Sequence, residues 1–319
     1  MPPKLPPLDP GAVRLIPLAQ RPSKAGLSGF GRPFPPGGSF KNFVDSLPGF
    51  LAAADLREAA RAVARARERD KTVMLAMGGH PVKVGLNPLI IDLLRRGVLT
   101  SLSGNGSLMV HDSEIALAGA TSEDVSASLG DGSFGVAAET GELINRAARE
   151  AAQEGRGLGF SLGRALRELN PRHLSLSLFA EAFRLEIPFT VHLALGTDVF
   201  NIHPDADGAA LGKASYEDFR AFSRLVATLE DGVFINLGSA VVMPEVFLKA
   251  LSLTRNLGHR QKGLTTVNMD FIRQYRAEEN VLKRPTLESG RSFNFTGHHE
   301  IMLPLLMSLV LEYLYPHGA

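Results

Sequence analysis

Short apolar segments that alternate with helical patterns constrain the fold of this chain more than any other feature. Segments suited to buried strands cover residues 72–77, 98–103, 189–195, 199–202, 233–237 and 264–269. Helical patterns precede and separate them, over residues 43–70, 87–96, 122–186, 216–229, 244–256 and 299–314. This alternation is typical of right-handed β-α-β crossovers, which build a parallel sheet with helices on both faces. The sequence therefore predicts a Rossmann-like α/β fold.

The first forty residues have a different composition from the rest of the chain. They contain ten of the 20 prolines, and proline lacks the N–H group that helices and central strands require. We expect a Pro-rich N-terminal arm over residues 1–40, either a solvated tail or an arm that covers a partner subunit. Residues 41–319 are expected to form a single Rossmann-like α/β domain, with residues 122–186 as a helical insertion.

Charge and cysteine content exclude several classes of function. The chain has 34 Lys and Arg against 33 Asp and Glu, so no overall charge draws it to nucleic acid or to a membrane surface. It has no cysteine, which excludes disulfides, thiolate metal sites and a thiol nucleophile. The longest apolar stretch, residues 301–311, is shorter than the roughly 20 residues that span a bilayer. We therefore expect a soluble cytoplasmic protein that binds neither nucleic acid nor membranes.

Glycine and small polar residues follow the predicted strands. In open parallel sheets, ligands bind beyond the carboxyl ends of the strands. The sequence contains neither a GxGxxG nor a GxxxxGK[ST] motif, and a single glycine at such a place is more often a turn former. Several glycine-bearing strand ends on one sheet edge nevertheless predict a dinucleotide or phosphate site. Its candidate residues are Gly78, Gly79, Lys83, Gly85, Ser103, Gly104, Asn105, Gly106, Asp207, Gly208, Gly238, Ser239 and Asn268.

Two clusters of histidine and carboxylate residues offer an alternative function. His203, Asp205 and Asp207 form one cluster, and residues 298–300, His-His-Glu, form the other. Imidazole and carboxylate groups are ligands for Zn²⁺ or Mn²⁺, so a metal-dependent hydrolase remains an alternative. The spacing lacks the i, i+4 helical pattern that makes HExxH specific, and the preferred interpretation includes no metal.

The order of these segments resembles the deoxyhypusine synthase family. TVMLAMGGHPVKVGLNPLIIDLLRRGVLTSLSGNGSLMVHDSEIAL resembles that family's strand, Ser/Gly-rich loop, helix and second strand. HPDADGAALGKASYEDF is similar to its Thr-Asp-Gly segment, VFINLGSAVVMPEVFLKALSLTRNLG to its strand, glycines and helix, and TTVNMDFIRQY to its Ile-Asn-Thr segment. The resemblance extends in order over residues 72–300.

The resemblance implies an NAD-binding, Rossmann-like homo-oligomer, usually a tetramer, that accepts hydride from a polyamine. NAD would bind at the glycine-bearing strand ends named above. Acidic side chains near them, including Asp207, would hold a cationic, polyamine-like small-molecule substrate. The residues expected to bind this substrate are Asp112, Glu114, His203, Asp205 and Glu300.

The chain departs from the family at the catalytic positions. The family's Trp-Gly-Lys, with its imine-forming lysine, is replaced by residues 296–300, Thr-Gly-His-His-Glu. His298 or His299 is therefore expected to act as a general base. Glu245 stands where the family has a histidine pair, and we expect it to be a further catalytic residue that orients the cationic substrate. We expect an enzyme that performs NAD-linked hydride or group transfer on a small amine. A non-catalytic nucleotide-binding or assembly protein is the remaining alternative.

Overall fold

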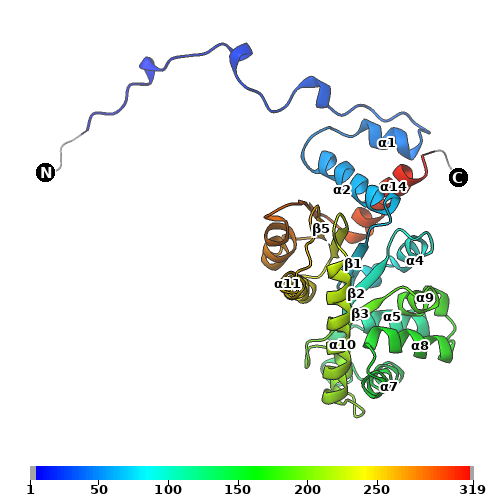
Figure 1. Cartoon of the computed structure of the whole chain (residues 1–319). Helices are drawn as coiled ribbons and strands as arrows, with labels where there is room; N and C mark the ends of the chain where they lie inside the picture. The colour runs from blue at the N-terminus through cyan, green and yellow to red at the C-terminus, as the bar shows by residue number, and fades with distance from the viewer. Residues whose placement is uncertain (1–4, 317–319) are drawn as a thin grey trace. The chain divides into compact units, whose positions relative to one another are not determined.

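A six-stranded parallel sheet forms the centre of the computed structural model, which describes residues 5–316 (Figure 1). The strand order is β3-β2-β1-β4-β5-β6, with every adjacent pair parallel. This confirms the predicted Rossmann-like α/β fold. The strands are β1 (Val73–Met77), β2 (Ser101–Asn105), β3 (Phe189–His192), β4 (Val233–Leu237), β5 (Thr265–Asp270) and β6 (Arg291–Thr296).

The chain divides after Ala54 into two compact units. In the first, the short helical turns η1 (Pro10–Ala12), η2 (Leu18–Gln20) and η3 (Leu27–Gly29) precede α1 (Phe40–Ser46). The Ser39 hydroxyl accepts from the Asn42 N–H, and the Asn42 side chain accepts from the Ser39 N–H, which forms a capping box. The predicted boundary between an arm and a single domain at residue 40 stays a prediction.

Helices fill the connections between strands in the second unit. Helix α2 (Leu51–Glu68) leads into β1, and α10 (Gly208–Ala227) packs against both α7 (Ala138–Glu154) and α11 (Val242–Asn256) (Figure 1). Among residues 5–316, no helix combines the length and apolar character needed to cross a membrane. The other segments are α3 (His80–Lys83), α4 (Asn87–Arg95), α5 (Gly106–Ala118), α6 (Val125–Ser128), α8 (Leu158–Leu169), η4 (Leu174–Leu176), α9 (Leu178–Arg184), η5 (Val199–Ile202), α12 (Tyr275–Ala277), the π-helical η6 (Glu278–Lys283), α13 (Arg284–Thr286) and α14 (His299–Leu314).

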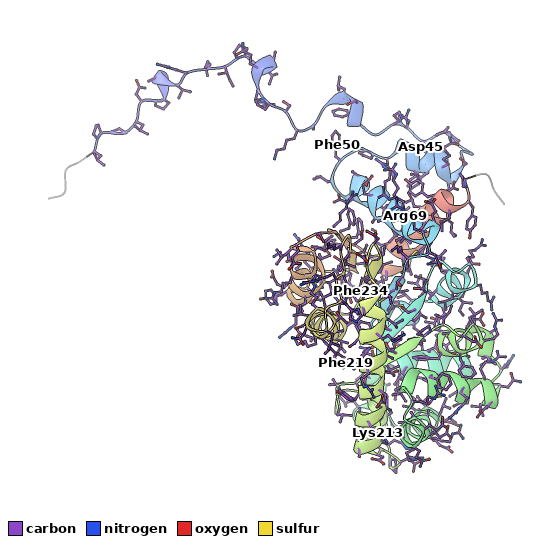
Figure 2. The ribbon with its side chains drawn as sticks, viewed as in Figure 1. Asp45, Phe50, Arg69, Lys213, Phe219 and Phe234 are labelled. Atoms are coloured by element: carbon purple, nitrogen blue, oxygen red, sulfur yellow. The ribbon has the colours of Figure 1, made fainter. Side chains whose placement is uncertain are left out.

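Aromatic side chains between the sheet and its helices form much of the core. Phe234 of β4 stacks on Phe247 of α11 with ring centroids 3.8 Å apart. Phe222 of α10 meets Phe234 edge to face, and Phe219 packs against the same buried cluster (Figure 2). All five residues of β1 and of β4 are buried, as expected for central strands of a parallel sheet.

Several predicted boundaries were wrong. The pattern over residues 43–70 is split into α1 and α2 around Pro48 and Gly49, since proline interrupts a helix. Strand β2 lies later than predicted and ends at Asn105, and the apolar segment 199–202 is the 3₁₀ helix η5 rather than a strand. Edge strand β6 was not predicted, because only Phe293 and Phe295 of its six residues are buried, which leaves a weak apolar pattern.

Candidate functional site

The strand order defines a switch point between β1 and β4. From β1 the chain continues to β2 on one side, and from β4 it continues to β5 on the other. Helices that leave neighbouring strands in opposite directions open a crevice at their carboxyl ends, where ligands of such sheets bind. The residues that follow β1 and β4 therefore form the centre of the candidate site.

Two glycine turns meet at this switch point without room for a side chain. A Cβ added at Gly78 would lie 2.3 Å from the carbonyl oxygen of Gly238. Gly238 has a φ of 65°, in the left-handed region, and a Cβ there would lie 2.5 Å from Cε1 of His299. A Cβ at Gly79 would lie 2.8 Å from both Cδ2 of His111 and Oγ of Ser107. Glycine is thus required at all three positions by the close approach of neighbouring groups.

A histidine pair covers the β4 turn. Nδ1 of His80, in the first turn of α3, lies 2.8 Å from Nδ1 of His299 at the start of α14. His299 is fully buried, and its Nε2 lies 3.9 Å from Oδ1 of Asp270. Burial and the neighbouring His80 lower the pKa of His299, which keeps this imidazole neutral near pH 7.

A row of three asparagines, two of them buried, crosses the sheet behind the β4 turn. Asn236, Asn268 and Asn294 are register partners on β4, β5 and β6. The Asn236 side chain donates to Oδ1 of Asn268 at 2.8 Å, and that of Asn268 donates to Oδ1 of Asn294 at 2.9 Å. Oδ1 of Asn236 has no hydrogen-bond partner, so one buried acceptor remains free beside the switch point.

A pocket of about 200 Å³, lined by both polar and apolar side chains, opens next to the β1 turn. Helix α3 contributes Lys83, α5 contributes Ser107, His111 and Glu114, and the segment after β3 contributes Asp198. Glu123, Thr140, Gly141, Thr197 and Phe200 also line it. Because Gly79 contacts both Ser107 and His111, the pocket and the switch point are contiguous.

Two lining side chains of this pocket, His111 and Glu114, form a hydrogen-bonded chain with Thr121. The Thr121 hydroxyl donates to Oε2 of Glu114, and its oxygen lies 2.8 Å from Nδ1 of His111. Burial opposes ionisation of Glu114, but the neighbouring His111 and the hydrogen bond from Thr121 outweigh it, and the pKa lies below its ordinary value. The pocket therefore holds an ionised carboxylate coupled through a hydroxyl to an imidazole.

Asp198 faces this wall with few hydrogen bonds of its own. A Cβ at Gly106 would lie 2.0 Å from Oδ2 of Asp198, so the carboxylate rests against the first residue of α5. Burial raises the pKa of Asp198 to about 6. Within residues 5–316, its carboxylate accepts a single hydrogen bond, from the hydroxyl of Thr197 at 3.4 Å.

Part of the predicted cofactor set lies away from any open surface. Ser103 and Gly104 are buried inside β2, and the Asn105 side chain caps α5 by accepting from Leu108 N. Gly106 is covered by Asp198. Among the remaining predicted cofactor residues, Lys83 lines the pocket. Gly78, Gly79 and Ser239 are buried in the switch-point turns, and Gly238 is half-buried there.

The other predicted cofactor residues lie elsewhere. Asn268 belongs to the buried asparagine row, and Asp207 accepts from Ala209 N and Ala210 N at the start of α10. Gly208 is the first residue of that helix. Gly85 has a φ of 79° and no atom within 4 Å of an added Cβ, as in an exposed turn.

The predicted substrate-binding residues do not lie together in the structure. Glu114 lines the pocket, whereas Asp112 is fully buried and accepts from Asn87, Ser177 Oγ and Leu178 N. Asp112 therefore fixes the start of α9 and does not contact a ligand. His203 packs against Gly141, Asp205 is exposed and 3.9 Å from Arg149, and Glu300 is exposed beside His298.

The predicted catalytic residues are not brought together. His298 is 71% exposed, while His299 is buried and paired with His80. The carboxylate of Glu245 is held by Lys249, Arg276 and Asn280, and these contacts lower its pKa. His111 and Thr121 were missed, although His111 and Glu114 have the i, i+3 spacing that brings side chains together on a helix.

The geometry does not favour the metal-hydrolase alternative. His203 follows edge strand β3 and His298 follows the opposite edge strand β6, roughly 24 Å apart by strand spacing. Within residues 5–316, no three His, Asp or Glu side chains are grouped as metal ligands.

Comparison with solved structures supports the fold assignment. The sequence matches no family model and no curated protein. AgrE in its ternary complex with ornithine and NAD⁺ superimposes with a TM-score of 0.55 at 16% identity, over 82% of this chain and 33% of that chain. Unliganded AgrE gives a TM-score of 0.53 at 15% identity, over 80% of this chain and 32% of that chain.

A protein from Entamoeba histolytica assigned as a deoxyhypusine synthase is similar along its whole length. It superimposes with a TM-score of 0.50 at 13% identity, over 88% of this chain and 95% of that chain. The expected resemblance to deoxyhypusine synthases is thus confirmed at the level of the fold. The chain corresponds to about a third of the AgrE chains, so it shares one fold with part of those proteins.

Proposed function

We propose that this chain is an NAD-dependent enzyme that performs hydride or group transfer on a small amine. One observation carries the proposal: the tightly packed glycine turns at the β1–β4 switch point are contiguous with the acidic pocket. A cofactor at the switch point and a substrate in the pocket would therefore be neighbours. Ligands of open parallel sheets bind at such switch points.

The groups at the switch point fit a dinucleotide. Gly78, Gly79 and Gly238 allow the two turns to pack closely at the strand ends, and exposed Lys83 supplies a cation for a diphosphate. The free Oδ1 of Asn236 is a buried acceptor at the same edge. Bound NAD⁺ would supply the hydride acceptor for the reaction, and AgrE, which has this fold, is solved with NAD⁺.

The pocket supports an amine as the substrate. Glu114, Glu123 and Asp198 line it together with a single lysine, Lys83. Carboxylates in a partly buried pocket favour a cationic ligand, since an opposite charge compensates their loss of solvation. The ornithine in the AgrE complex carries such amino groups.

Calorimetric titration of the purified protein with NAD⁺ tests the cofactor part of this proposal. We expect binding by the unmodified protein and at least about tenfold weaker binding by Lys83→Met, a loss of about 1.4 kcal/mol. Lys213→Met is the matched control, because Lys213 is an exposed lysine of α10 that does not line the pocket. Absence of NAD⁺ binding by the unmodified protein would overturn the proposal. An equal loss of affinity in both variants would show that Lys83 does not contact the cofactor.

A homo-oligomer, with a tetramer as the specific expectation, is part of the same proposal. Light scattering coupled to size exclusion would support it by giving a mass four times 34.3 kDa. A mass equal to one chain at micromolar concentration would contradict it.

A further inference from the structure

The hydrogen bonds around Thr121 determine which nitrogen of His111 carries the proton. Glu114 is ionised and can only accept, so the single hydroxyl proton of Thr121 is donated to Glu114 Oε2. Toward His111, the Thr121 oxygen is therefore an acceptor, and the 2.8 Å contact requires a proton on Nδ1. A neutral imidazole protonated on Nδ1 has its lone pair on Nε2.

The free lone pair lies on the side of the ring that faces the candidate site. Cδ2, the ring carbon bonded to Nε2, is the His111 atom nearest to Gly79, 2.8 Å from a Cβ added there. The same side chain lines the pocket together with Lys83 and Asp198. Nε2, which is bonded to Cδ2, therefore lies on the edge of the His111 ring that is nearer to the switch point.

We propose that His111 is the general base of this site and that Thr121 and Glu114 are its positioning residues. This inference rests on the proposed amine chemistry. In the step, the N–H bond of the substrate ammonium breaks, its electron pair stays on the substrate nitrogen, and the proton forms a new bond to Nε2 of His111. The resulting imidazolium keeps its Nδ1–H bond to Thr121, and the Glu114 carboxylate, 3.7 Å from Nδ1, offsets its charge.

Neither His298 nor His299 offers the same combination. His299 is buried with Nδ1 engaged by His80, and His298 points to solvent at 71% exposure. The charged groups that face His111 are Glu114 from its own helix, Asp198 from the segment after β3, Lys83 from α3 and Glu123 from the segment before α6. Two of these carboxylates, Glu114 and Asp198, favour the protonated product of the step.

Nitrogen-15 NMR of the imidazole side chains tests the tautomer without any cofactor or substrate. In the unmodified protein near pH 8, we expect His111 to show a protonated Nδ1 and an unprotonated Nε2. Thr121→Val should shift His111 toward a mixture of tautomers, and Thr121→Ser should restore the Nδ1–H form because it keeps the hydroxyl. A protonated Nε2 in the unmodified protein, or a Thr121→Val spectrum identical to it, would overturn the positioning role.

Turnover measurements then test the base. With NAD⁺ and 1,4-diaminobutane as the probe, His111→Gln should lower kcat about 100-fold or more while its calorimetric Kd for NAD⁺ stays unchanged. Thr121→Val should lower kcat and shift the acidic limb of its pH profile, and Thr121→Ser should recover both. His259→Gln, at an exposed histidine on the surface, is the control.

The outcomes separate the inference from the function on which it rests. Binding of NAD⁺ with turnover that His111→Gln does not reduce would overturn the base and leave the proposed function standing. Failure to bind NAD⁺ would overturn the proposed function, whereas the NMR result would still decide the arrangement of His111, Thr121 and Glu114.

Discussion

The imidazoles of His80 and His299 meet Nδ1 to Nδ1 at 2.8 Å, an arrangement that holds only while one ring donates and the other accepts. The contact joins α3, directly after β1, to the start of α14. It therefore links the switch point to the last helix of the chain. Protonation of both rings would place two N–H groups face to face.

The His80–His299 contact predicts a loss of stability in mild acid. The pKa of His299 in the folded protein is lowered below 6.5, by burial first and then by His80. As the pH falls through 6.5, the unfolded chain takes up a proton that the folded protein does not, so the free energy of unfolding falls. His299→Gln lacks this titration. We expect the unfolding free energy of the unmodified protein, measured with urea, to fall relative to that of His299→Gln between pH 8 and pH 5. A relative unfolding free energy that stays constant or rises over this range would contradict the prediction.

Asp218 predicts the opposite dependence at a second buried group. Its carboxylate accepts from Gly159 N and Val191 N, and burial raises its pKa from 3.8 to about 7. The folded protein thus holds a proton between these values that the unfolded chain has lost, and stability decreases as the pH rises. Relative to Asp218→Asn, the unmodified protein should lose up to about 1.4 kcal/mol per pH unit in this window. Urea unfolding at pH 5 and pH 8 measures the difference, and an advantage that grows with pH would refute the assignment.

The contact between the two switch-point turns predicts that Gly78 cannot be replaced. In Gly78→Ala, the Cβ would lie 2.3 Å from a backbone oxygen of Gly238, which can move only with the β4 turn. We expect a loss of about 1–3 kcal/mol in unfolding free energy, together with weaker NAD⁺ binding. Gly212→Ala is the control: its added Cβ has no atom within 4 Å, and alanine inside α10 should stabilise by about 0.5–1 kcal/mol. Similar urea midpoints of unfolding for Gly78→Ala and Gly212→Ala would show that the two turns do not pack as described.

Asp112 is expected to affect stability and not ligand binding. It accepts four hydrogen bonds, from Asn87, Ser177, Leu178 and Phe179. Asp112→Ala leaves these buried donors without an acceptor, which should lower the free energy of unfolding by about 2 kcal/mol or more. The Kd for NAD⁺ of the folded variant should be unchanged. A large change in the Kd for NAD⁺ with an unchanged free energy of unfolding would show that Asp112 takes part in ligand binding.

The central elements of the fold could be predicted because their residues are uniformly apolar or periodic. The buried run of β4 and the apolar helix α14 were predicted with their observed bounds. Strand β2 was misplaced because Gly104 and Asn105 belong to it, although glycine and asparagine ordinarily end strands. Edge strand β6 has only one buried face, so its pattern was too weak to recognise.

The site was less predictable than the fold because it depends on pairings between distant segments. The glycines after β1 and β4 were identified, but only the strand order shows that Gly78 and Gly238 touch. His299 was identified as a base from the sequence, yet its burial against His80 follows from the packing of α14. The His111–Glu114 spacing was visible in the sequence, whereas the bridging role of Thr121 depends on the turn after α5.

Calorimetric titration with NAD⁺ tests the central claim most directly, because the proposed chemistry depends on a cofactor at the β1–β4 switch point. We predict saturable binding with a micromolar Kd, weakened in Lys83→Met and unchanged in Lys213→Met. A protein that is folded by circular dichroism and yet gives no heat of binding at millimolar NAD⁺ would contradict the account.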